Sequence, residues 1–195
     1  LAAEVLAGHP AASVIAFADE AVATELQQLF TGPTLRIYTN PDLVGCEVAG
    51  VVKNVIAIAA GMCDGMGFGD NSKATLITRG LAEMARLGIA MGAKALTFGG
   101  LAALGDLVAT CASARSRNNS VGRALGEGRR IEEIVGAMNM VAEGVKSSPS
   151  VVELARRHRV EMPIVEQVAD VCAGTIDART ALTRLMTRAS KSERL

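Results

Sequence analysis

The chain has 195 residues, half of them hydrophobic and only 3% aromatic, and its 20 basic and 20 acidic side chains cancel to a formal net charge of zero. Nucleic-acid binding needs surplus Lys and Arg and aromatic platforms for stacking, so this composition argues against a nucleic-acid partner. The length fits one large domain or two small ones. With 20 glycines and so few aromatics, the core must be built from small side chains, which let helices approach closely.

The chain gives no sequence signal for a membrane or for secretion. Its most apolar stretch, Val55 to Cys63, has about half the length that a bilayer span requires. The first residues lack Met, a basic region and an apolar signal core. We therefore expect no membrane partner, a cytoplasmic location, and a chain that begins inside a longer protein.

The cysteines and histidines are too scattered to predict a metal site. No CxxC pair occurs, and the two histidines, His9 and His158, lie far apart in the sequence. We expect buried free thiols in a reducing compartment. The four cysteines are Cys46, Cys63, Cys111 and Cys172.

Residues 1–40 have the pattern of a strand–helix–strand unit. The run from Ala12 to Phe17 predicts a short buried strand, Glu20 to Phe30 has apolar residues at helical spacing, and Leu35 to Asn40 predicts a second strand. This is the βαβ unit of a parallel sheet. One such unit cannot cover both faces of a sheet. We therefore expect residues 1–40 to be the C-terminal fragment of a Rossmann dinucleotide-binding domain.

After residue 40 the pattern becomes helical. The apolar segment from Val44 to Gly67 predicts a buried central helix. A Gly-rich loop at 65–71 precedes a second long helix, Ser72 to Ala93, with Asn71 or Ser72 as its N-cap. Residues 41–195 are thus predicted to form an all-helical domain, and the chain as a whole to be mainly α. Further short helices are predicted at Ala95–Gly99, Gly105–Ala112, Ser120–Gly126, Arg130–Met138, Ser150–Arg157, Pro163–Ala173 and Ala178–Arg188.

Lys53 is the only charged residue between Val48 and Cys63. A buried ammonium costs several kcal/mol unless it is paired or gives up its proton, so Lys53 is a candidate proton donor or acceptor. The alternative is a structural lysine that reaches the surface or pairs with an acid. Its neighbour Asn54 could orient a substrate or could simply hydrogen-bond between packed helices.

Asp106 is a second isolated charge among apolar residues, with Thr110 four positions later on the same helical face. An acid and a hydroxyl placed this way can hold a substrate hydroxyl or a lysine ammonium. Alternatively, Asp106 is an ordinary acidic residue at a helix start, stabilised by the helix dipole.

A basic, Asn-rich segment, Arg115 to Ser120, comes directly before a helical pattern. It offers guanidinium groups, side-chain donors and free backbone N–H groups to a phosphate, although such a segment can also be a solvated loop. Gly65, Gly67 and Gly69 do not form a dinucleotide fingerprint, because that motif lies between a strand and a helix. We interpret them as a tight connection between helices.

Taken together, these segments resemble NAD(P)-dependent glycerol-3-phosphate dehydrogenases of the bacterial type. The resemblance covers about Ala2 to Ala173 and includes several uncommon motifs in order. They are the central helix, glycine loop and following helix (47–88), LAALGDLVATC (101–111), Ser-Arg-Asn (116–118), VGRALGEG (121–128) and VAEG (141–144).

The resemblance implies a role for each matching residue in the interconversion of sn-glycerol 3-phosphate and dihydroxyacetone phosphate with NAD or NADP. Lys53 would be the general acid/base, with Asp106 as its catalytic partner. The substrate-binding residues would be Lys53, Asn54, Asp106, Thr110, Ser116, Arg117 and Asn118. The residues toward the cofactor would be Ala2, Arg117, Val141 and Glu143.

The family pattern also includes parts that this sequence does not contain. A GxGxxG strand–helix turn is absent, and Ala3 stands where the pattern Ala-Lys-Glu has a lysine, so we assign Ala3 no role. We expect the chain to be inactive, and to bind NADH weakly, without a cofactor domain. The family's helical domain, of the 6-phosphogluconate dehydrogenase C-terminal type, would then be the substrate-binding and catalytic half of an enzyme that feeds phospholipid synthesis.

Two alternatives remain at the level of sequence. One is another dehydrogenase of the same helical-domain superfamily, of the β-hydroxyacid or ketopantoate type, whose substrates lack phosphate. The other is a non-catalytic fragment whose apolar helices form a homodimer. A homodimer is also possible for the enzyme itself.

Overall fold

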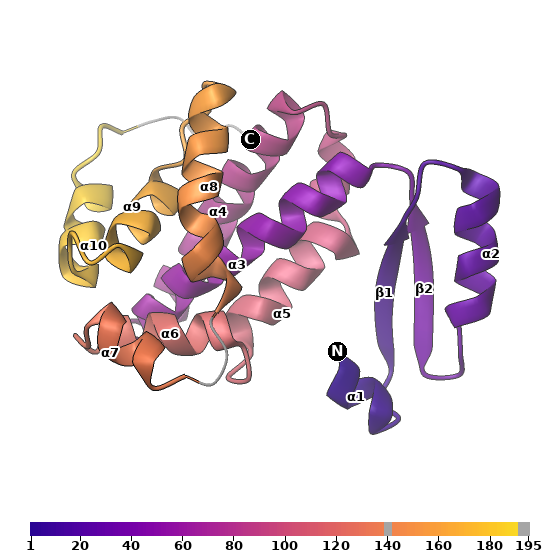
Figure 1. Cartoon of the computed structure of the whole chain (residues 1–195), viewed down its shortest axis with the longest axis horizontal. Coiled ribbons are helices and arrows are strands. Elements are labelled where there is room, and N and C mark those ends of the chain that lie inside the picture. The colour runs from indigo at the N-terminus through magenta and orange to yellow at the C-terminus, as the bar shows by residue number, and fades with distance from the viewer. Residues whose placement is uncertain (139–141, 191–195) are drawn as a thin grey trace.

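The computed structural model of the chain describes residues 1–138 and 142–190. Figure 1 shows a small strand–helix–strand unit at one side of a larger group of helices. The mainly helical fold and the single N-terminal βαβ piece confirm the fold predicted from the sequence. The domain boundary at residue 40 stays a prediction.

The N-terminal unit consists of α1 (Ala2–Leu6), β1 (Ala11–Ala16), α2 (Glu20–Phe30) and β2 (Leu35–Asn40). The two strands pair in parallel, from Ala11 opposite Leu35 to Ala16 opposite Asn40. The unit contributes little to the core, because Ile37 is the only strand residue that is fully buried.

The helical part is organised around α3 (Leu43–Gly65), which is buried along most of its length. Further helices and turns follow it in the chain, and most of them pack directly against it (Figure 1). They are α4 (Asp70–Ala90), the 3-10 turn η1 (Ala95–Gly99), the π turn η2 (Leu101–Gly105), α5 (Asp106–Ala112), α6 (Arg117–Gly126), α7 (Ile131–Gly136), α8 (Glu143–Arg157), α9 (Pro163–Cys172) and α10 (Ala178–Met186). In the described part of the chain, no strand follows β2.

Small residues let α3 and α6 cross with their backbones almost in contact, as the composition predicts. A Cβ atom added to Gly61 would lie 2.1 Å from the carbonyl oxygen of Asn119, and one added to Gly122 would lie 1.9 Å from that of Ile58. Gly65 and Gly126 continue this crossing one turn further along each helix. The close approach places the first turn of α6 directly beside the middle of α3.

Several predicted helix boundaries were wrong. The helix α4 begins at Asp70, with Gly69 and not Asn71 or Ser72 as N-cap. The helix α6 begins at Arg117, so the Arg-Asn segment forms its first turn and does not precede it. These starts were missed because polar residues occupy the first turns, where apolar periodicity gives no signal.

Two further boundaries differ for other reasons. The helix α8 begins at Glu143 although Pro149 lies within it, and a proline inside a helical pattern normally marks an end. Ahead of α5, the residues from Leu101 form a π turn that sequence patterning did not predict.

The helix α3 has the length and apolar composition of a membrane span, but 61% of its most apolar window is buried inside the molecule. A core helix passes the same test, so this is weak evidence for a membrane. The cysteines are free thiols, as expected, but only Cys63 and Cys111 are fully buried. Burial raises the pKa of Cys111 to about 12, which leaves its thiol protonated and unreactive.

Candidate active site

Lys53 of α3 and Asp106 of α5 form an ion pair between Lys53 Nζ and Asp106 Oδ2. The Lys53 side chain is 20% exposed and the Asp106 side chain 42% exposed, so the pair lies at the rim of the core and solutes can reach it. Lys53 therefore pairs with an acid. This fits both a proton donor and a structural lysine, the two interpretations of this residue that the sequence allows. The accessible rim leaves room for a small molecule to contact the ammonium.

Thr110 holds the other side of the Asp106 carboxylate. Its hydroxyl lies 2.6 Å from the Asp106 carbonyl oxygen and 3.2 Å from Asp106 Oδ1, and it donates to both. The two carboxylate oxygens thus have separate partners, Lys53 and Thr110. The predicted spacing of Asp106 and Thr110 on one helical face accounts for this contact.

Asn54 connects the middle of α3 to two other helices. Its Nδ2 donates to Glu143 Oε2 at 3.1 Å, at the start of α8, and its Oδ1 accepts from Asn118 Nδ2 at 2.9 Å. Asn118 Oδ1 in turn accepts from the backbone N–H of Gly144 at 2.9 Å. The amides of Asn54 and Asn118 are buried, and these bonds fix their orientations. Lys53 is next in sequence to this network, so both clusters share one turn of α3.

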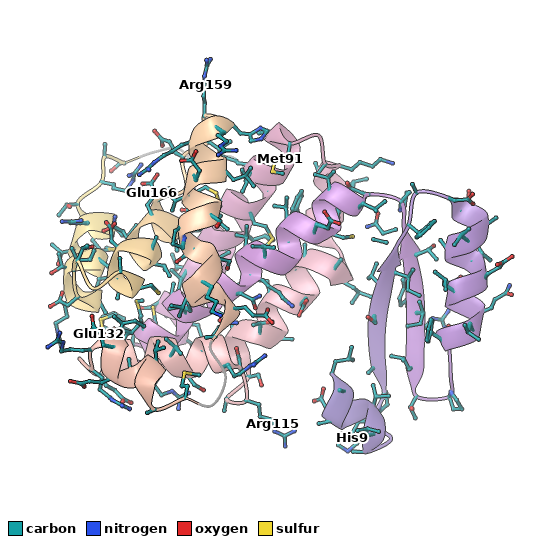
Figure 2. The ribbon with its side chains drawn as sticks, in the orientation of Figure 1. His9, Met91, Arg115, Glu132, Arg159 and Glu166 are labelled. Atoms are coloured by element: carbon teal, nitrogen blue, oxygen red, sulfur yellow. The ribbon has the colours of Figure 1, made fainter. Side chains whose placement is uncertain are left out.

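The first turn of α6 carries the predicted phosphate-binding residues. Ser116 is the N-cap, and its Oγ accepts from the backbone N–H of Asn119 at 3.3 Å. The N–H groups of the first helical residues have no partner within the helix, so the start of α6 can face an anion. Arg117 is exposed, and Arg115, outside the helix, projects away from the bundle (Figure 2).

The structure separates the remaining predicted residues into three cases. Glu143 joins the site through Asn54. Ala2 is exposed on α1, and Figure 1 shows α1 beside the lower end of the strands, apart from α3. Val141 lies outside the described residues.

Three buried or half-buried acids have partners that the sequence did not show. Asp42 accepts from Thr97 Oγ1 at 2.6 Å and from the backbone N–H groups of Gly45 and Lys94. Burial raises its pKa, but these hydrogen bonds outweigh burial and lower it overall. Asp64 and Glu83 are the other two. The sequence has no signal for the partners of Asp64 and Glu83, because these lie on other helices.

The residues present fit one end of a dinucleotide better than the other. A pyrophosphate binds at a Gly-rich turn before a helix N-terminus. Between β1 and α2 the chain has no glycine, and Asp19 Oδ1 already accepts from the N–H groups of Ala21 and Val22. That helix start is therefore closed to a phosphate. Polar groups that a nicotinamide carboxamide could contact lie instead around Glu143, near Lys53.

The arrangement of a short βαβ piece followed by helices around one buried helix is found in a dehydrogenase of known structure. A crystal structure of glycerol-3-phosphate dehydrogenase from Coxiella burnetii matches it with a TM-score of 0.92 and 41% identity, over 96% of this chain and 58% of that one. The family described as NAD-dependent glycerol-3-phosphate dehydrogenase C-terminus matches residues 42–183. The chain belongs to this family.

Curated proteins similar to this chain carry the name of the same family. Glycerol-3-phosphate dehydrogenase (NAD(P)+) 2 of Sphingopyxis alaskensis is 57% identical over 182 residues, which cover 93% of this chain and 54% of that protein. Glycerol-3-phosphate dehydrogenase (NAD(P)+) of Geobacter sulfurreducens is 54% identical over 193 residues, covering 99% of this chain and 58% of that protein. The chain thus spans a little over half the length of these relatives.

Proposed function

We propose that the chain is the substrate-binding and catalytic part of an NAD(P)-dependent enzyme that interconverts dihydroxyacetone phosphate and sn-glycerol 3-phosphate. The observation that supports this most is the accessible Lys53–Asp106 pair on the same turn of α3 as Asn54, which is bonded to the first turn of α6. A proton donor and a candidate phosphate site are thereby held on one rigid frame. The substrate and the class of cofactor in this proposal are taken from the names of the relatives.

In the proposed reaction, a bound nicotinamide supplies the hydride to the substrate's carbonyl carbon or accepts it back. Lys53 Nζ gives its proton to the carbonyl oxygen as negative charge develops there, which forms the C2 hydroxyl, and takes that proton back in the reverse direction. Asp106 keeps Lys53 oriented, and Thr110 fixes Asp106. Lys53 then exchanges its proton with solvent.

The substrate phosphate is proposed to bind at the start of α6. The Arg117 guanidinium supplies charge, and the N–H groups of Arg117 and Asn118 point out of the helix end. Because Ser116 Oγ accepts a bond from Asn119 N–H, its own hydroxyl proton is free to donate to a phosphate oxygen. Glu143 and Arg117 would contact the nicotinamide side of the cofactor.

Cytoplasmic location and a place in phospholipid synthesis are part of the proposal. The four cysteines are free, which fits a reducing compartment. The product, sn-glycerol 3-phosphate, is the chemical backbone of glycerophospholipids. A homodimer stays a prediction.

The role of Lys53 can be tested in the protein extended to the full length of its relatives. Lys53→Ala should lower turnover by about 10²- to 10⁴-fold, the usual contribution of a general acid/base, with an unchanged circular dichroism spectrum. Lys94→Ala, which removes an exposed lysine outside the site, is the matched control and should keep normal turnover. Near-normal turnover of Lys53→Ala would rule out the role.

A further inference from the structure

A second polar cluster joins the start of α6 to the last turns of α3 and α5. Its centre is Asn119, which is 1% exposed. Asn119 Nδ2 donates to the carbonyl oxygen of Cys111 at 3.0 Å, in the last turn of α5, and to Asp64 Oδ2 at 3.2 Å, near the end of α3. One buried amide therefore holds three helices together.

Asp64 keeps its charge in this half-buried place because cations surround it. Lys73 of α4 pairs with Asp64 Oδ1, and Arg123 of α6 lies 3.9 Å from Asp64 Oδ2. Burial raises the pKa of Asp64, but the hydrogen bonds from Lys73 and Asn119 and the two positive charges outweigh burial and lower it. Asp64 is therefore a carboxylate at neutral pH, and a charged acceptor makes a stronger bond to the Asn119 amide than a neutral one.

The neighbouring residues Asn118 and Asn119 of α6 thus bind to different helices. Asn118 reaches toward Asn54 and Gly144, whereas Asn119 reaches toward Asp64 and Cys111. Together they fix both sides of the turn that carries Arg117. Asp64 itself cannot touch a substrate at Lys53, since eleven residues along a helix span about 16 Å.

We propose that Asp64 and Asn119 are positioning residues for phosphate recognition, holding the start of α6 where its N–H groups and Arg117 meet the substrate's phosphate. The inference rests on the proposed function. It predicts that loss of the cluster lowers kcat/KM for a phosphorylated ketone and leaves kcat/KM for an unphosphorylated ketone unchanged. Only the phosphorylated ketone needs the start of α6. A network that merely stabilises the fold would affect both substrates alike.

The test compares kcat/KM for dihydroxyacetone phosphate and for dihydroxyacetone in the protein at the full length of its relatives. Asp64→Asn, which keeps the side-chain size, weakens the charged hydrogen bond that holds Asn119 and should raise KM for the phosphorylated ketone about tenfold if that whole loss reaches the phosphate site. Its kcat/KM for dihydroxyacetone should stay within about twofold of the unmodified protein's. Asn119→Ala should show the same selectivity with a larger loss.

Asp170→Asn is the matched control, because it removes a carboxylate that pairs with Arg184 on the surface, outside this cluster. It should leave both substrates unchanged. If Asn119→Ala does not fold, Asp64→Asn alone decides the question. Equal losses for the two ketones, or no loss for either, would overturn the inference. Failure of the unmodified protein to prefer the phosphorylated ketone would instead contradict the proposed function.

Discussion

The contact between α3 and α6 is built differently at its two ends. Toward the C-terminus of both helices, glycines let the backbones touch. Toward the start of α6, buried amides hold the helices through hydrogen bonds that extend to α5 and α8. The first end contributes packing, and the second end positions polar groups beside Lys53. Substitutions at the glycine end should therefore change stability, and those at the amide end should change activity as well.

The largest effect on stability is expected at the glycine end. Gly122→Ala would place a Cβ 1.9 Å from the backbone oxygen of Ile58, and since neither backbone can move alone, the free energy of unfolding should fall by about 3 kcal/mol. Urea unfolding measures this change. Gly50→Ala on α3 is the control, because nothing lies within 4 Å of the added atom. It should raise the free energy of unfolding by up to about 1 kcal/mol. Similar results for the two variants would show that the crossing is not close.

At the amide end, Asn118→Ala should lower the free energy of unfolding by about 2 kcal/mol, because it leaves the Gly144 N–H and Asn54 Oδ1 without their partner. Unlike Gly122→Ala, it should also lower kcat/KM for dihydroxyacetone phosphate under conditions in which the protein stays folded. The control is Asn71→Ala, at an exposed position in the first turn of α4. Destabilisation without any change in kcat/KM would remove the distinction between the two ends.

A smaller, pH-dependent effect is expected away from this contact, at Glu83 of α4. Its carboxylate is 2% exposed and accepts from the N–H groups of Ile164 and Val165 at the start of α9. Burial raises the pKa of Glu83 from 4.5 to about 7 although these hydrogen bonds act to lower it. The folded protein thus binds a proton there more tightly than the unfolded chain, so its stability should fall as pH rises between these two values.

The slope of this decline is at most about 1.4 kcal/mol per pH unit. In Glu83→Gln, which cannot ionise, the decline between about pH 4.5 and 7 should be smaller by the contribution of this one group. Urea unfolding of both proteins across this pH range measures the difference. Parallel pH profiles would show that Glu83 does not have a raised pKa in the folded protein.

The sequence predicted well what depends on local periodicity. Both strands, α2 and the central helix follow from apolar spacing, and Lys53 and Asp106 were recognisable because a charge in an apolar run is unusual. It predicted poorly what depends on contacts between distant helices. Asn119 belongs to a segment that could be a solvated loop, and only its contacts with α3 and α5 show that it is buried. Glu83 gave no signal, because its partner Ile164 lies 81 positions away in the sequence. The ion pairs of Asp64 with Lys73 and Arg123 could not be predicted from the sequence alone.

The central claim is that the amide-held start of α6 recognises a phosphate next to Lys53. The most direct test measures the ratio of kcat/KM for dihydroxyacetone phosphate to that for dihydroxyacetone, in the protein at the full length of its relatives and in its Arg117→Ala variant. We predict a strong preference for the phosphorylated ketone that falls on the order of a hundredfold in Arg117→Ala, as expected for loss of charged hydrogen bonds to one group. A preference that survives this substitution unchanged would contradict the account.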